Sequence, residues 1–576
     1  MSLGIEKTTQ SGIDYIDQLI SYRKWTLGED RTITWTITRD DALFSDEPYG
    51  IRGELPYFRA VSNPNDIANI HKAMDVFSSI LDINLKYVDE RVDGEATIRF
   101  NAYDDSSDRS LGGGWAYGPY ARSYGGDVWA SWHSSYGMAF TLHEVGHVLA
   151  LDHPGHATGV GVPGFTTLET VMSYTGGKRV FQEDRDGNYL GRVETNSLGI
   201  YDIAALQYLY GANKTHNADD TVYRFDPKVG FYTTLWDGGG MDSIDLSNYM
   251  LGAHVDLREG QYSSITYETP SRGISAHTYT GENAIGIAYG TVIENAFGSQ
   301  GDDVIQGNAA DNILIGNGGN DRLYGGDGND RLEGGSGHDV LDGGSGADVL
   351  IGGDGDDVYY VDNVADVVVE GVNGGTDTVY LSIDARGSKL YLNVETLIAR
   401  EGATVRYVSG NALDNRVVGN SGDNVLLGCD GNDVLVGGKG NDVFDGGLGN
   451  DTFVFNRGDG NDTICRGFTT PDDIDTLAFG EGITLEQLSF RADARQRNLV
   501  ISIAGSDDSV TVSDYITRRD GVLDRITLAS GQVLDNSDID RLIDAMAAFS
   551  STGLGQMTLP YYAAQPLAPN LAAAQF

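Results

Sequence analysis

The sequence predicts an α+β domain followed by an all-β domain of parallel β-roll type, and three observations support this fold class. Strand-like and helix-like segments are mixed over residues 1–230, without regular βαβ alternation. From Gly298 the sequence adopts a strict nine-residue period. Glycine, which suits tight turns, makes up 78 of the 576 residues. A chain of this length is too long for one core, so we expect several domains.

The first region contains segments with clear strand and helix periodicity. Alternation of apolar and polar residues predicts strands over 32–38, 96–100 and 126–131. A helix is expected over 66–83, because Ile67, Ile70, Met74, Phe77 and Ile80 fall on one helical stripe. Further helices are expected over 139–151 and 197–213.

Nine-residue blocks of the pattern G-G-x-G-x-D-x-U-x, where U is a large apolar residue, form two arrays. Seven blocks begin at Gly298, Gly307, Gly316, Gly325, Gly334, Gly343 and Gly352, and five more at Gly410, Gly419, Gly428, Gly437 and Gly446. The U residues of the first array are expected to point inward from short strands: Ile305, Leu314, Leu323, Leu332, Leu341, Leu350 and Tyr359. Regular apolar positions argue against a flexible glycine-rich linker, so the pattern favours a solenoid.

The sixth position of most blocks is aspartate, and carboxylates together with turn carbonyls form the oxygen-only sites that calcium prefers. Two blocks make one coil of the roll, so ligands should pair turns that are 18 residues apart. The predicted calcium-binding residues are Gly301, Asp303, Gly319, Asp321, Gly328, Asp330, Gly337, Asp339, Gly346, Asp348, Gly355, Asp357, Asp433, Asp442 and Asp451. We expect about five to eight calcium ions. Ala310, Asn312, Leu413, Asn415 and Asn424 depart from the pattern and weaken their turns.

The rest of the chain is divided by composition. Residues 361–409 are rich in Val, Tyr and Leu and are expected to add strands to the solenoid, and a small β unit with a helix is expected over 468–549. We expect an N-terminal segment over 1–25, a mixed α+β domain over 26–232 and a calcium-binding roll over 233–467, with repeats at 298–360 and 410–454. The last segment, 550–576, has no charged side chain.

Charge and cysteine content exclude several classes of function. The net charge of −45 argues against a nucleic-acid partner, because phosphate binding needs basic patches. Two cysteines cannot form a disulfide framework. No apolar run is long enough to span a membrane, and the N-terminus lacks the apolar core of a signal peptide.

The segment HEVGHVLALDH carries a metal-binding pattern. His143 and His147 are four residues apart, so both imidazoles share one helical face and can hold one zinc ion. Glu144 is adjacent and placed to take a proton from water. About 0.2 His-x-x-x-His pairs are expected by chance in this chain, and the requirement for Glu lowers that further. The alternative without metal binding is a pair of surface histidines on an amphipathic helix.

These residues, followed by TVMSY at 170–174, resemble the metzincin zinc proteases. DHPG after the helix, MSY in the turn and the nonapeptide roll resemble the serralysin family in particular, with haemolysin-type (RTX) calcium-binding repeats. Similar stretches occur at 113–119, 202–213, 235–247 and 292–303, so the resemblance covers most of the chain. It implies a metzincin-type fold for the first domain and a secreted zinc metalloendopeptidase that is stabilised by calcium. With it, residues 26–232 would be the catalytic domain, 1–25 a candidate propeptide and 550–576 a candidate secretion signal.

The resemblance also implies residue roles. His143, His147 and His153 would bind one zinc ion, Glu144 would be the general base, and Met172 would lie beneath the site. Tyr174 would be a zinc-proximal phenol that stabilises the oxyanion. The remaining roles are a substrate-binding edge strand at Gly114, Trp115, Ala116 and Tyr117, and a calcium site of Thr221, Asp237, Gly239 and Asp242, with Glu294 helping to bind the first roll calcium.

One position departs from the family pattern. Metzincins usually have glycine three residues after the second histidine, where the chain turns sharply, and this chain has Ala150. A positive φ at that position would cost alanine about 1–2 kcal/mol. The alternative function is a calcium-dependent surface, adhesion or S-layer-associated protein with an inactive metzincin domain.

The resemblance and the lack of an N-terminal signal predict type I secretion from a Gram-negative bacterium to the extracellular medium. The expected partners are protein or peptide substrates, the type I secretion machinery and a proteinaceous inhibitor. No nucleic acid and no membrane span are expected, and the protein is expected to be a monomer.

Overall fold

The computed structural model describes residues 3–550 except 39–57, 104–113, 121–123, 132–135, 155–164, 175–179, 194, 272, 276–277, 387–390, 466, 468–469, 471, 494, 496 and 519–522. The chain divides into two compact units, Met1–Gly335 and Ser336–Phe576. Within the described residues, no helix combines the length and the apolar character needed to cross a membrane. The predicted tail over 550–576 lies outside the described residues apart from Ser550.

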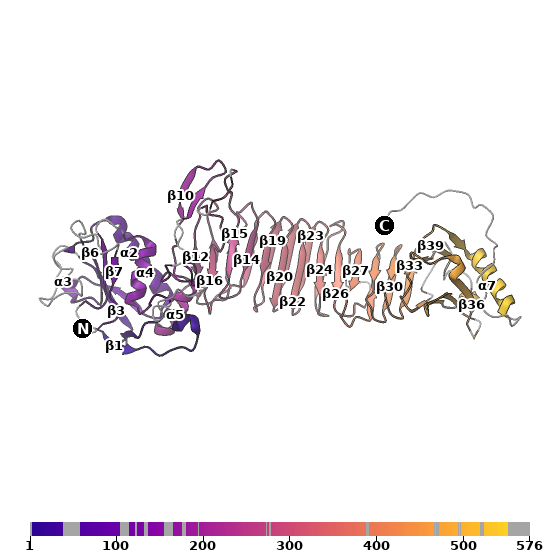
Figure 1. Cartoon of the computed structure of the whole chain (residues 1–576), viewed down its shortest axis with the longest axis horizontal. Helices are drawn as coiled ribbons and strands as arrows, with labels where there is room; N and C mark the ends of the chain where they lie inside the picture. The colour runs from indigo at the N-terminus through magenta and orange to yellow at the C-terminus, as the bar shows by residue number, and fades with distance from the viewer. Residues whose placement is uncertain are drawn as a thin grey trace. The chain divides into compact units, whose positions relative to one another are not determined.

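A mostly parallel sheet forms the centre of the N-terminal region (Figure 1). Its strand order is β5-β3-β6-β8-β7, and β7 pairs antiparallel with β8 at one edge. The strands are β3 (Thr32–Ile37), β5 (Asn84–Tyr87), β6 (Ile98–Tyr103), β7 (Gly114–Ala116) and β8 (Asp127–Ser131), and β4 (Phe58–Arg59) pairs with β6 off this path. The strands expected at 32–38, 96–100 and 126–131 correspond to β3, β6 and β8.

Three longer helices accompany this sheet: α2 (Pro64–Ile80), α4 (Met138–Val148) and α5 (Ile200–Tyr210). Asn63 begins α2, because its side chain accepts a hydrogen bond from the Asn65 N–H and Pro64 fixes the first helical φ. Of the predicted stripe on α2, all members except Ile67 are buried, and Ile67 packs against the same core. The predicted apolar stripe therefore faces the core that α2 shares with α4 and α5.

The N-terminal segment is part of this core. β1 (Gly4–Lys7) pairs antiparallel with β2 (Arg23–Thr26), and the short helix α1 (Asp14–Asp17) lies between them. Leu19 is fully buried, and the Trp25 indole donates a 2.9 Å hydrogen bond to the carbonyl of Val148. This segment therefore packs directly against the end of α4.

Outside the sheet, the first unit also has the short helix α3 (Glu90–Asp93) and a hairpin of β9 (Val180–Glu183) and β10 (Tyr189–Val193). Its β-roll part has two rows of strands. One row is β11 (Val222–Arg224), β13 (Ser243–Asp245), β17 (Asn295–Phe297) and β19 (Ile313–Gly318), all parallel. The other contains β14 (Ala253–Asp256), β18 (Val304–Gln306) and β20 (Arg322–Asp327), also parallel, together with β12 (Thr233–Leu235), β15 (Tyr262–Ile265) and β16 (Ile285–Ile287).

The second unit continues the same construction. Parallel pairs join β22 (Val340–Ser345), β24 (Val358–Val361), β26 (Thr378–Leu381), β27 (Thr396–Ala399), β29 (Arg416–Val418), β31 (Val434–Val436), β33 (Thr452–Phe455), β35 (Thr476–Phe479) and β39 (Arg525–Leu528) in that order. The expected extra strands of 361–409 are therefore present within the roll.

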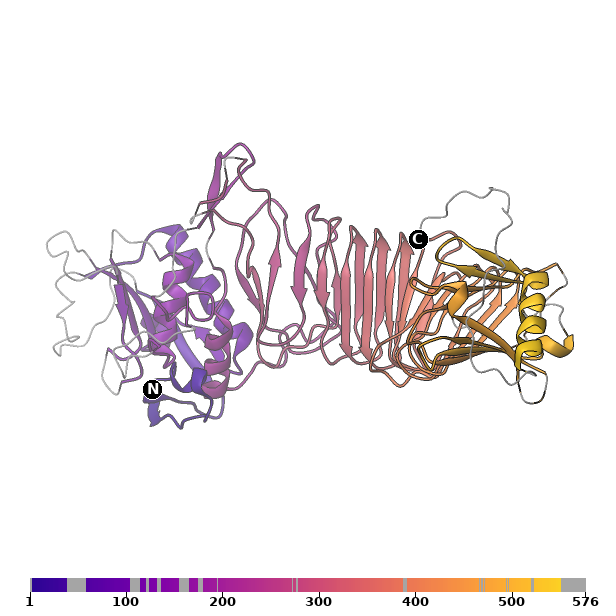
Figure 2. The ribbon, with the colours of Figure 1, turned by 45° about the vertical axis from the view of Figure 1, so that its right-hand side comes forward.

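The opposite row of the second unit begins with β23 (Val349–Asp354) and β25 (Val367–Val369), which are parallel. It resumes with β28 (Tyr407–Ser409), β30 (Val425–Asp430), β32 (Val443–Leu448), β34 (Asn461–Ile464) and β38 (Ser509–Val512). β37 (Leu499–Ile503) and β36 (Leu488–Ala492) extend it antiparallel, and α7 (Asn536–Ser550) packs on β36 and β40 (Val533–Asp535), as Figure 2 shows in yellow.

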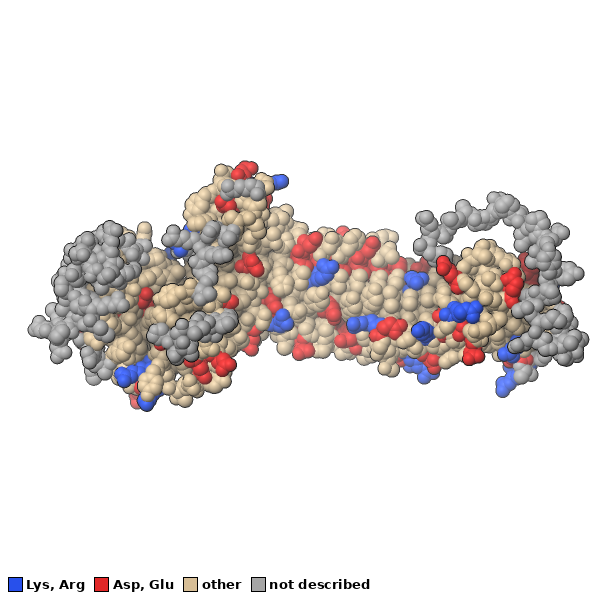
Figure 3. Space-filling view, viewed as in Figure 1, with Lys and Arg blue, Asp and Glu red and all other residues tan. Residues whose placement is uncertain are grey.

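The core of the roll is one apolar side chain deep. The predicted inward residues of the first array, from Ile305 to Tyr359, are all fully buried. Acidic side chains are spread over the face of the roll in Figure 3, but the sixth-position aspartates lie inside, at 0–1% exposure. Burial of so many carboxylates needs hydrogen bonds or cations.

Candidate functional site

The end of α4 brings three histidines together. His143 and His147 lie on one face of the helix, and the chain then reverses through Ala150, whose φ is +75°. The Leu151 N–H donates a 2.8 Å hydrogen bond back to the Gly146 carbonyl, which closes the turn. The predicted positive φ at Ala150 is therefore present, and it directs His153 back toward the helix.

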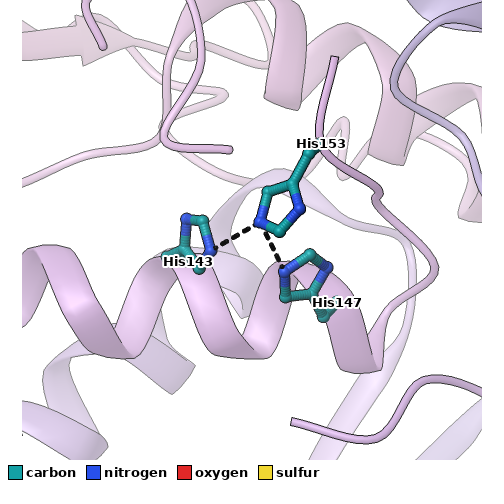
Figure 4. A group of neighbouring side chains, drawn as sticks. All are labelled: His143, His147 and His153. Carbon is teal, nitrogen blue, oxygen red and sulfur yellow. Dashed lines mark hydrogen bonds between the residues drawn. The ribbon is translucent and has the colours of Figure 1, made fainter. Parts of the chain in front are cut away.

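The three imidazoles converge through their Nε2 atoms (Figure 4). His153 Nε2 lies 3.1 Å from His147 Nε2 and 3.2 Å from His143 Nε2. The three rings provide ligand atoms that all lie within 4.8 Å of one another. Converging nitrogens of this kind fit a tetrahedral zinc ion with one open position.

Backbone carbonyls set the orientation of two of the rings. His143 Nδ1 donates to the Val171 carbonyl at 2.7 Å, and His147 Nδ1 donates to the Leu151 carbonyl at 2.9 Å. A carbonyl can only accept, so Nδ1 carries the proton. The Nε2 lone pair therefore faces the space between His143, His147 and His153, which we call the histidine cage. Burial lowers the pKa of His143, which favours the neutral, metal-binding form.

Glu144 and Tyr174 lie beside the cage. Glu144 is 6% exposed, and burial raises its pKa to about 8. The Tyr174 hydroxyl is 3.3 Å from His143 Nε2, although the side chain is 76% exposed. Met172 is fully buried, with its sulfur 2.8 Å from where a Cβ on Gly146 would lie, so a larger residue at that position would displace the Met172 side chain.

Asp202 at the start of α5 supports the site, and the sequence analysis did not single it out. Its carboxylate accepts hydrogen bonds from the Thr170 hydroxyl, from the Val171 N–H at 2.7 Å and from the Gly199 N–H at 2.9 Å. The Val171 carbonyl in turn accepts a hydrogen bond from His143 Nδ1. The buried Asp202 carboxylate therefore fixes the loop that orients His143. The sequence feature that could have indicated this role is a lone acidic residue in the apolar helix segment 202–213.

A cavity of about 530 Å³ opens beside the histidines. Its lining includes His147, His153 and, on the β7 side, Ala116 and Tyr117. β7 ends the described strand order and continues into the cavity wall, and the substrate-binding role of residues 114–117 stays a prediction. Ser21, Tyr22 and Arg23 of the N-terminal segment also line it.

The predicted calcium residues around β13 come together in the first unit. The Thr221 N–H donates to Asp242 Oδ1 at 2.8 Å, and the Asp242 N–H donates to Glu294 Oε2 at 2.7 Å. The Gly239 N–H donates to Asp237 Oδ1 at 2.9 Å. Asp242 Oδ2 is buried without a hydrogen-bond partner, and burial, ahead of the nearby Asp237 and Glu294 charges, raises the pKa of Asp242 to about 7. These oxygens fit a calcium ion.

In the roll, sixth-position carboxylates accept hydrogen bonds from the backbone of the turn one coil earlier. The Asp303 N–H donates to Asp321 Oδ1, and the Asp339 N–H donates to Asp357 Oδ1, both at 2.7 Å and across 18 residues. The predicted 18-residue pairing of turns is thus observed in the backbone. The turn glycines have positive φ, and a Cβ on Gly355 would lie 1.7 Å from the Gly337 carbonyl oxygen.

The remaining predicted residues follow the same pattern. The Asp433 N–H donates to Asp451 Oδ1 at 2.9 Å, and the Asp442 N–H donates to Asp462 Oδ1 at 2.9 Å. The Oδ2 atoms of Asp433, Asp442, Asp451 and Asp462 are buried without hydrogen-bond partners. Asp330 and Asp348 have the corresponding positions in their turns, and Asp330 Oδ1 accepts from the Asn312 N–H at 2.7 Å. Gly301, Gly319, Gly328, Gly337 and Gly346 form the turns beside these aspartates.

The asparagine turns are closed differently. Asn312 Nδ2 donates to the Glu294 carbonyl at 2.8 Å, Asn415 Nδ2 to the Val394 carbonyl at 2.9 Å and Asn424 Nδ2 to the Val405 carbonyl at 2.7 Å. At these positions an amide N–H₂ satisfies the carbonyl oxygens, which aspartate cannot do. These turns therefore need no cation.

Comparison with known proteins agrees with this organisation. The RTX calcium-binding nonapeptide repeat family matches residues 297–332, 333–368, 409–442, 418–453 and 428–464, and the haemolysin-type calcium binding protein related domain matches 498–538. The serralysin of Proteus mirabilis is 30% identical over 332 residues, which cover 50% of this chain and 61% of that protein.

Two further relatives are similar. Serralysin B of Dickeya chrysanthemi is 33% identical over 38% of this chain and 49% of its own length, and metallopeptidase AprA of Pseudomonas marginalis is 29% identical over 48% and 60%. The chain thus spans about half to three fifths of the length of these relatives. A solved structure, the extracellular lipase LipA of Serratia marcescens, matches 37% of this chain and 38% of its own at 20% identity, with a TM-score of 0.13 that is too low to indicate a shared fold. The chain is therefore similar to serralysins over about half of its length, and it carries RTX calcium-binding repeats.

Proposed function

We propose that this protein is a zinc-dependent endopeptidase of metzincin type whose β-roll binds calcium. The observations that carry the proposal are the convergence of three Nε2 atoms and the burial of Glu144, which follows His143 and whose charge acts on Tyr174. An inert core histidine cluster would have no need for two Nδ1–carbonyl hydrogen bonds that leave the lone pairs facing one another.

His143, His147 and His153 would hold the zinc ion. When bound, zinc supplies Lewis-acid polarisation of a carbonyl and positive charge that lowers the pKa of nearby water and of Glu144. Glu144 would accept a proton from the attacking water and later donate it to the leaving amine. The Tyr174 hydroxyl would donate a hydrogen bond to the oxyanion, and its exposure leaves the ring free to change position.

The substrate would lie along β7. An edge strand offers unpaired backbone N–H and C=O groups, so an extended peptide can add to the sheet as a further strand. The cavity at the end of β7 contains His147 and His153, so such a peptide would pass the histidine cage. This geometry favours protein or peptide substrates over small molecules.

Calcium would complete the roll outside the cell. Calcium sites of extracellular modules have dissociation constants of about 10⁻⁴–10⁻³ M, so roll sites of this class would stay empty at cytosolic calcium and fill at millimolar external calcium. The chain would then leave the cell unfolded, by type I secretion, and fold afterwards. The expected number of ions is fewer than one per turn, because the Asn312, Asn415 and Asn424 turns are closed by amides.

Casein digestion and zinc content test the enzyme proposal together. Glu144→Ala should retain zinc and lose activity, since Glu144 is not a zinc ligand, whereas His143→Ala should lose both. His254→Ala, at an exposed histidine of β14, is the matched control and should keep both. Activity of Glu144→Ala within about tenfold of wild type would reject the proposed base. Full zinc content without proteolysis would instead favour the calcium-dependent surface protein.

A further inference from the structure

Strands β1 and β2 place two basic side chains directly opposite each other. Lys7 pairs with Arg23 in the antiparallel register, and residues paired in this way have their side chains on the same face. Like charges at such positions destabilise a strand pair. The preceding pair, Glu6 with Lys24, has opposite charges and forms a 3.2 Å ion pair. The pair of Lys7 and Arg23 is therefore unfavourable unless an anion lies beside it.

Arg23 faces the cavity beside the histidine cage. Side chains alternate along a strand, so Arg23 shares one face of β2 with Trp25, whose indole donates to the Val148 carbonyl at the end of α4. Arg23 lines the cavity of about 530 Å³ together with His147 and His153. A basic residue therefore lines the same cavity as two of the proposed zinc ligands.

No carboxylate neutralises these two cations within the described part of the chain, where neither Lys7 nor Arg23 forms an ion pair. The Lys7 ammonium lies 4.9 Å from the centre of the Tyr22 ring, and Tyr22 lines the cavity at 63% exposure. Asp152 also lines the cavity, and its Oδ1 accepts a hydrogen bond from the His153 N–H at 2.8 Å. The chain has 84 acidic and 39 basic residues, so a basic pair without a carboxylate is unusual in it.

The backbone that carries Tyr22 and Arg23 is held on two sides. The Ser21 N–H donates to the Ala150 carbonyl at 2.7 Å, and the Thr8 N–H donates to the Tyr22 carbonyl at 3.1 Å. The Thr8 hydroxyl donates to the Ser21 carbonyl at 2.6 Å. The side chains of Tyr22 and Arg23 are nonetheless exposed. Exposed side chains on a fixed backbone at a cavity wall add little to the core and are well placed to contact a ligand.

We propose that Arg23 and Lys7 form a substrate subsite that selects an acidic side chain close to the bond that is cut. This inference rests on the proposed peptidase function and adds the substrate class to it. Residues 117–120, which follow β7, line the same cavity as Arg23, so a peptide that extends the sheet at β7 would present a side chain to Arg23. A guanidinium can bind both oxygens of a carboxylate, and the Lys7 ammonium would add a second cation. The exposed rings of Tyr22 and Tyr120 would contact the methylene groups of a glutamate.

Peptide binding to the full chain tests this subsite. The probes are fluorescent ten-residue peptides of neutral residues, each with glutamate at one position and matched to a peptide with glutamine there. Fluorescence anisotropy measures their binding to the zinc-loaded Glu144→Ala variant, which should not cut them. We expect one position at which glutamate binds about three- to tenfold more tightly than glutamine at low salt. Adding Arg23→Gln should reduce this ratio to less than about twofold, and Arg23→Lys should keep part of it, because the charge remains.

Arg322→Gln in the same Glu144→Ala background is the matched control, since Arg322 is an exposed arginine of β20 outside the cavity lining. It removes the same charge and should keep the ratio of the parent. Because each ratio compares two peptides on one protein, a general loss of stability or of zinc cancels from it. A ratio near one at every position, or a ratio as high with Arg23→Gln as with Arg322→Gln, would overturn the proposal.

Cleavage of the same peptides by the wild type separates this inference from the proposed function. We expect the preferred glutamate peptide to exceed its glutamine partner in kcat/KM by a similar three- to tenfold factor, on the order of the binding ratio. Cleavage of both peptides at equal kcat/KM would overturn the subsite and keep the peptidase. Tighter glutamate binding that depends on Arg23, without cleavage of any peptide by the wild type, would reject the peptidase and keep the cavity as a site for acidic peptides.

Discussion

The Ser21 N–H donates a 2.7 Å hydrogen bond to the carbonyl of Ala150, the residue with positive φ that ends the α4 turn. The Asp152 N–H donates to the Leu19 carbonyl at 2.6 Å, so the N-terminal segment pairs with the chain between His147 and His153. Residues 1–25 stay candidates for a propeptide, but any processing that leaves the histidine cage intact should stop before Leu19.

The first prediction concerns this contact. Leu19→Ala should lower the free energy of unfolding of the N-terminal region by about 2–5 kcal/mol, because it leaves a cavity in the core beneath the turn. Zinc retention against a chelator should fall as well. Ile13→Ala is the control, since Ile13 is 43% exposed, and it should change neither quantity. Equal effects of the two substitutions in thermal melts would show that Leu19 does not support the turn.

Ala150 offers a second prediction. Ala150→Gly relieves a left-handed alanine, worth about 1–2 kcal/mol, but loses a buried methyl group of about 0.8 kcal/mol and makes the unfolded chain more flexible. We therefore expect the stability to change by less than about 1 kcal/mol, with activity retained. Ala150→Val should lose more than about 2 kcal/mol, because a β-branched side chain tolerates positive φ poorly. Denaturant melts of both variants would decide this, and a well-tolerated valine would contradict it.

Asp202 is the subject of the third prediction. Asp202→Asn should lower the free energy of unfolding by about 1–3 kcal/mol, because an amide cannot replace both carboxylate oxygens toward Thr170, Val171 and Gly199. Loosening of Val171 should also raise the rate at which a chelator removes zinc. Asp226→Asn, at an exposed turn aspartate, should leave both quantities unchanged. An unaltered zinc-release rate in Asp202→Asn would mean that the loop orients His143 without this carboxylate.

Sequence periodicity was sufficient to predict most of the strands of the roll and the main helices of the first domain. The strands of the roll follow from the nine-residue period, since each turn repeats the same glycine and aspartate geometry. The helix stripe from Ile67 to Ile80 and the pairing of His143 with His147 follow from the helical period alone. These features depend on residues that are near in sequence.

Contacts between distant residues could not be predicted in this way. Nothing in a local pattern joins Ser21 to Ala150 or Asp202 to Val171, because each pair depends on how separate elements pack. The asparagine turns show the same limit. Asn312, Asn415 and Asn424 were interpreted as weakened calcium turns, whereas their amides close the turns by hydrogen bonds that become visible only with the neighbouring coil in place.

The last prediction is that the roll loses stability with rising pH when calcium is absent. Burial raises the pKa of Asp433 and Asp442 to about 7 and that of Asp462 to about 8. In the unfolded chain these groups ionise near pH 4. The folded state therefore binds more protons between about pH 4 and pH 8, so its stability is largest below this range and falls as the pH rises through it.

Calcium should reverse this dependence, because the ion stabilises the ionised carboxylates and the protons compete with it. Thermal melts of the full chain followed by circular dichroism, after removal of metal on a chelating resin, would measure both effects. Without calcium, the roll should melt lower at pH 8 than at pH 5 by on the order of 5–10 °C, and millimolar calcium should raise the transition most at pH 8. A strand signal at pH 8 that is equally stable with and without calcium would show that the buried aspartates are neutralised in another way, and secretion of an unfolded chain would then need a different explanation.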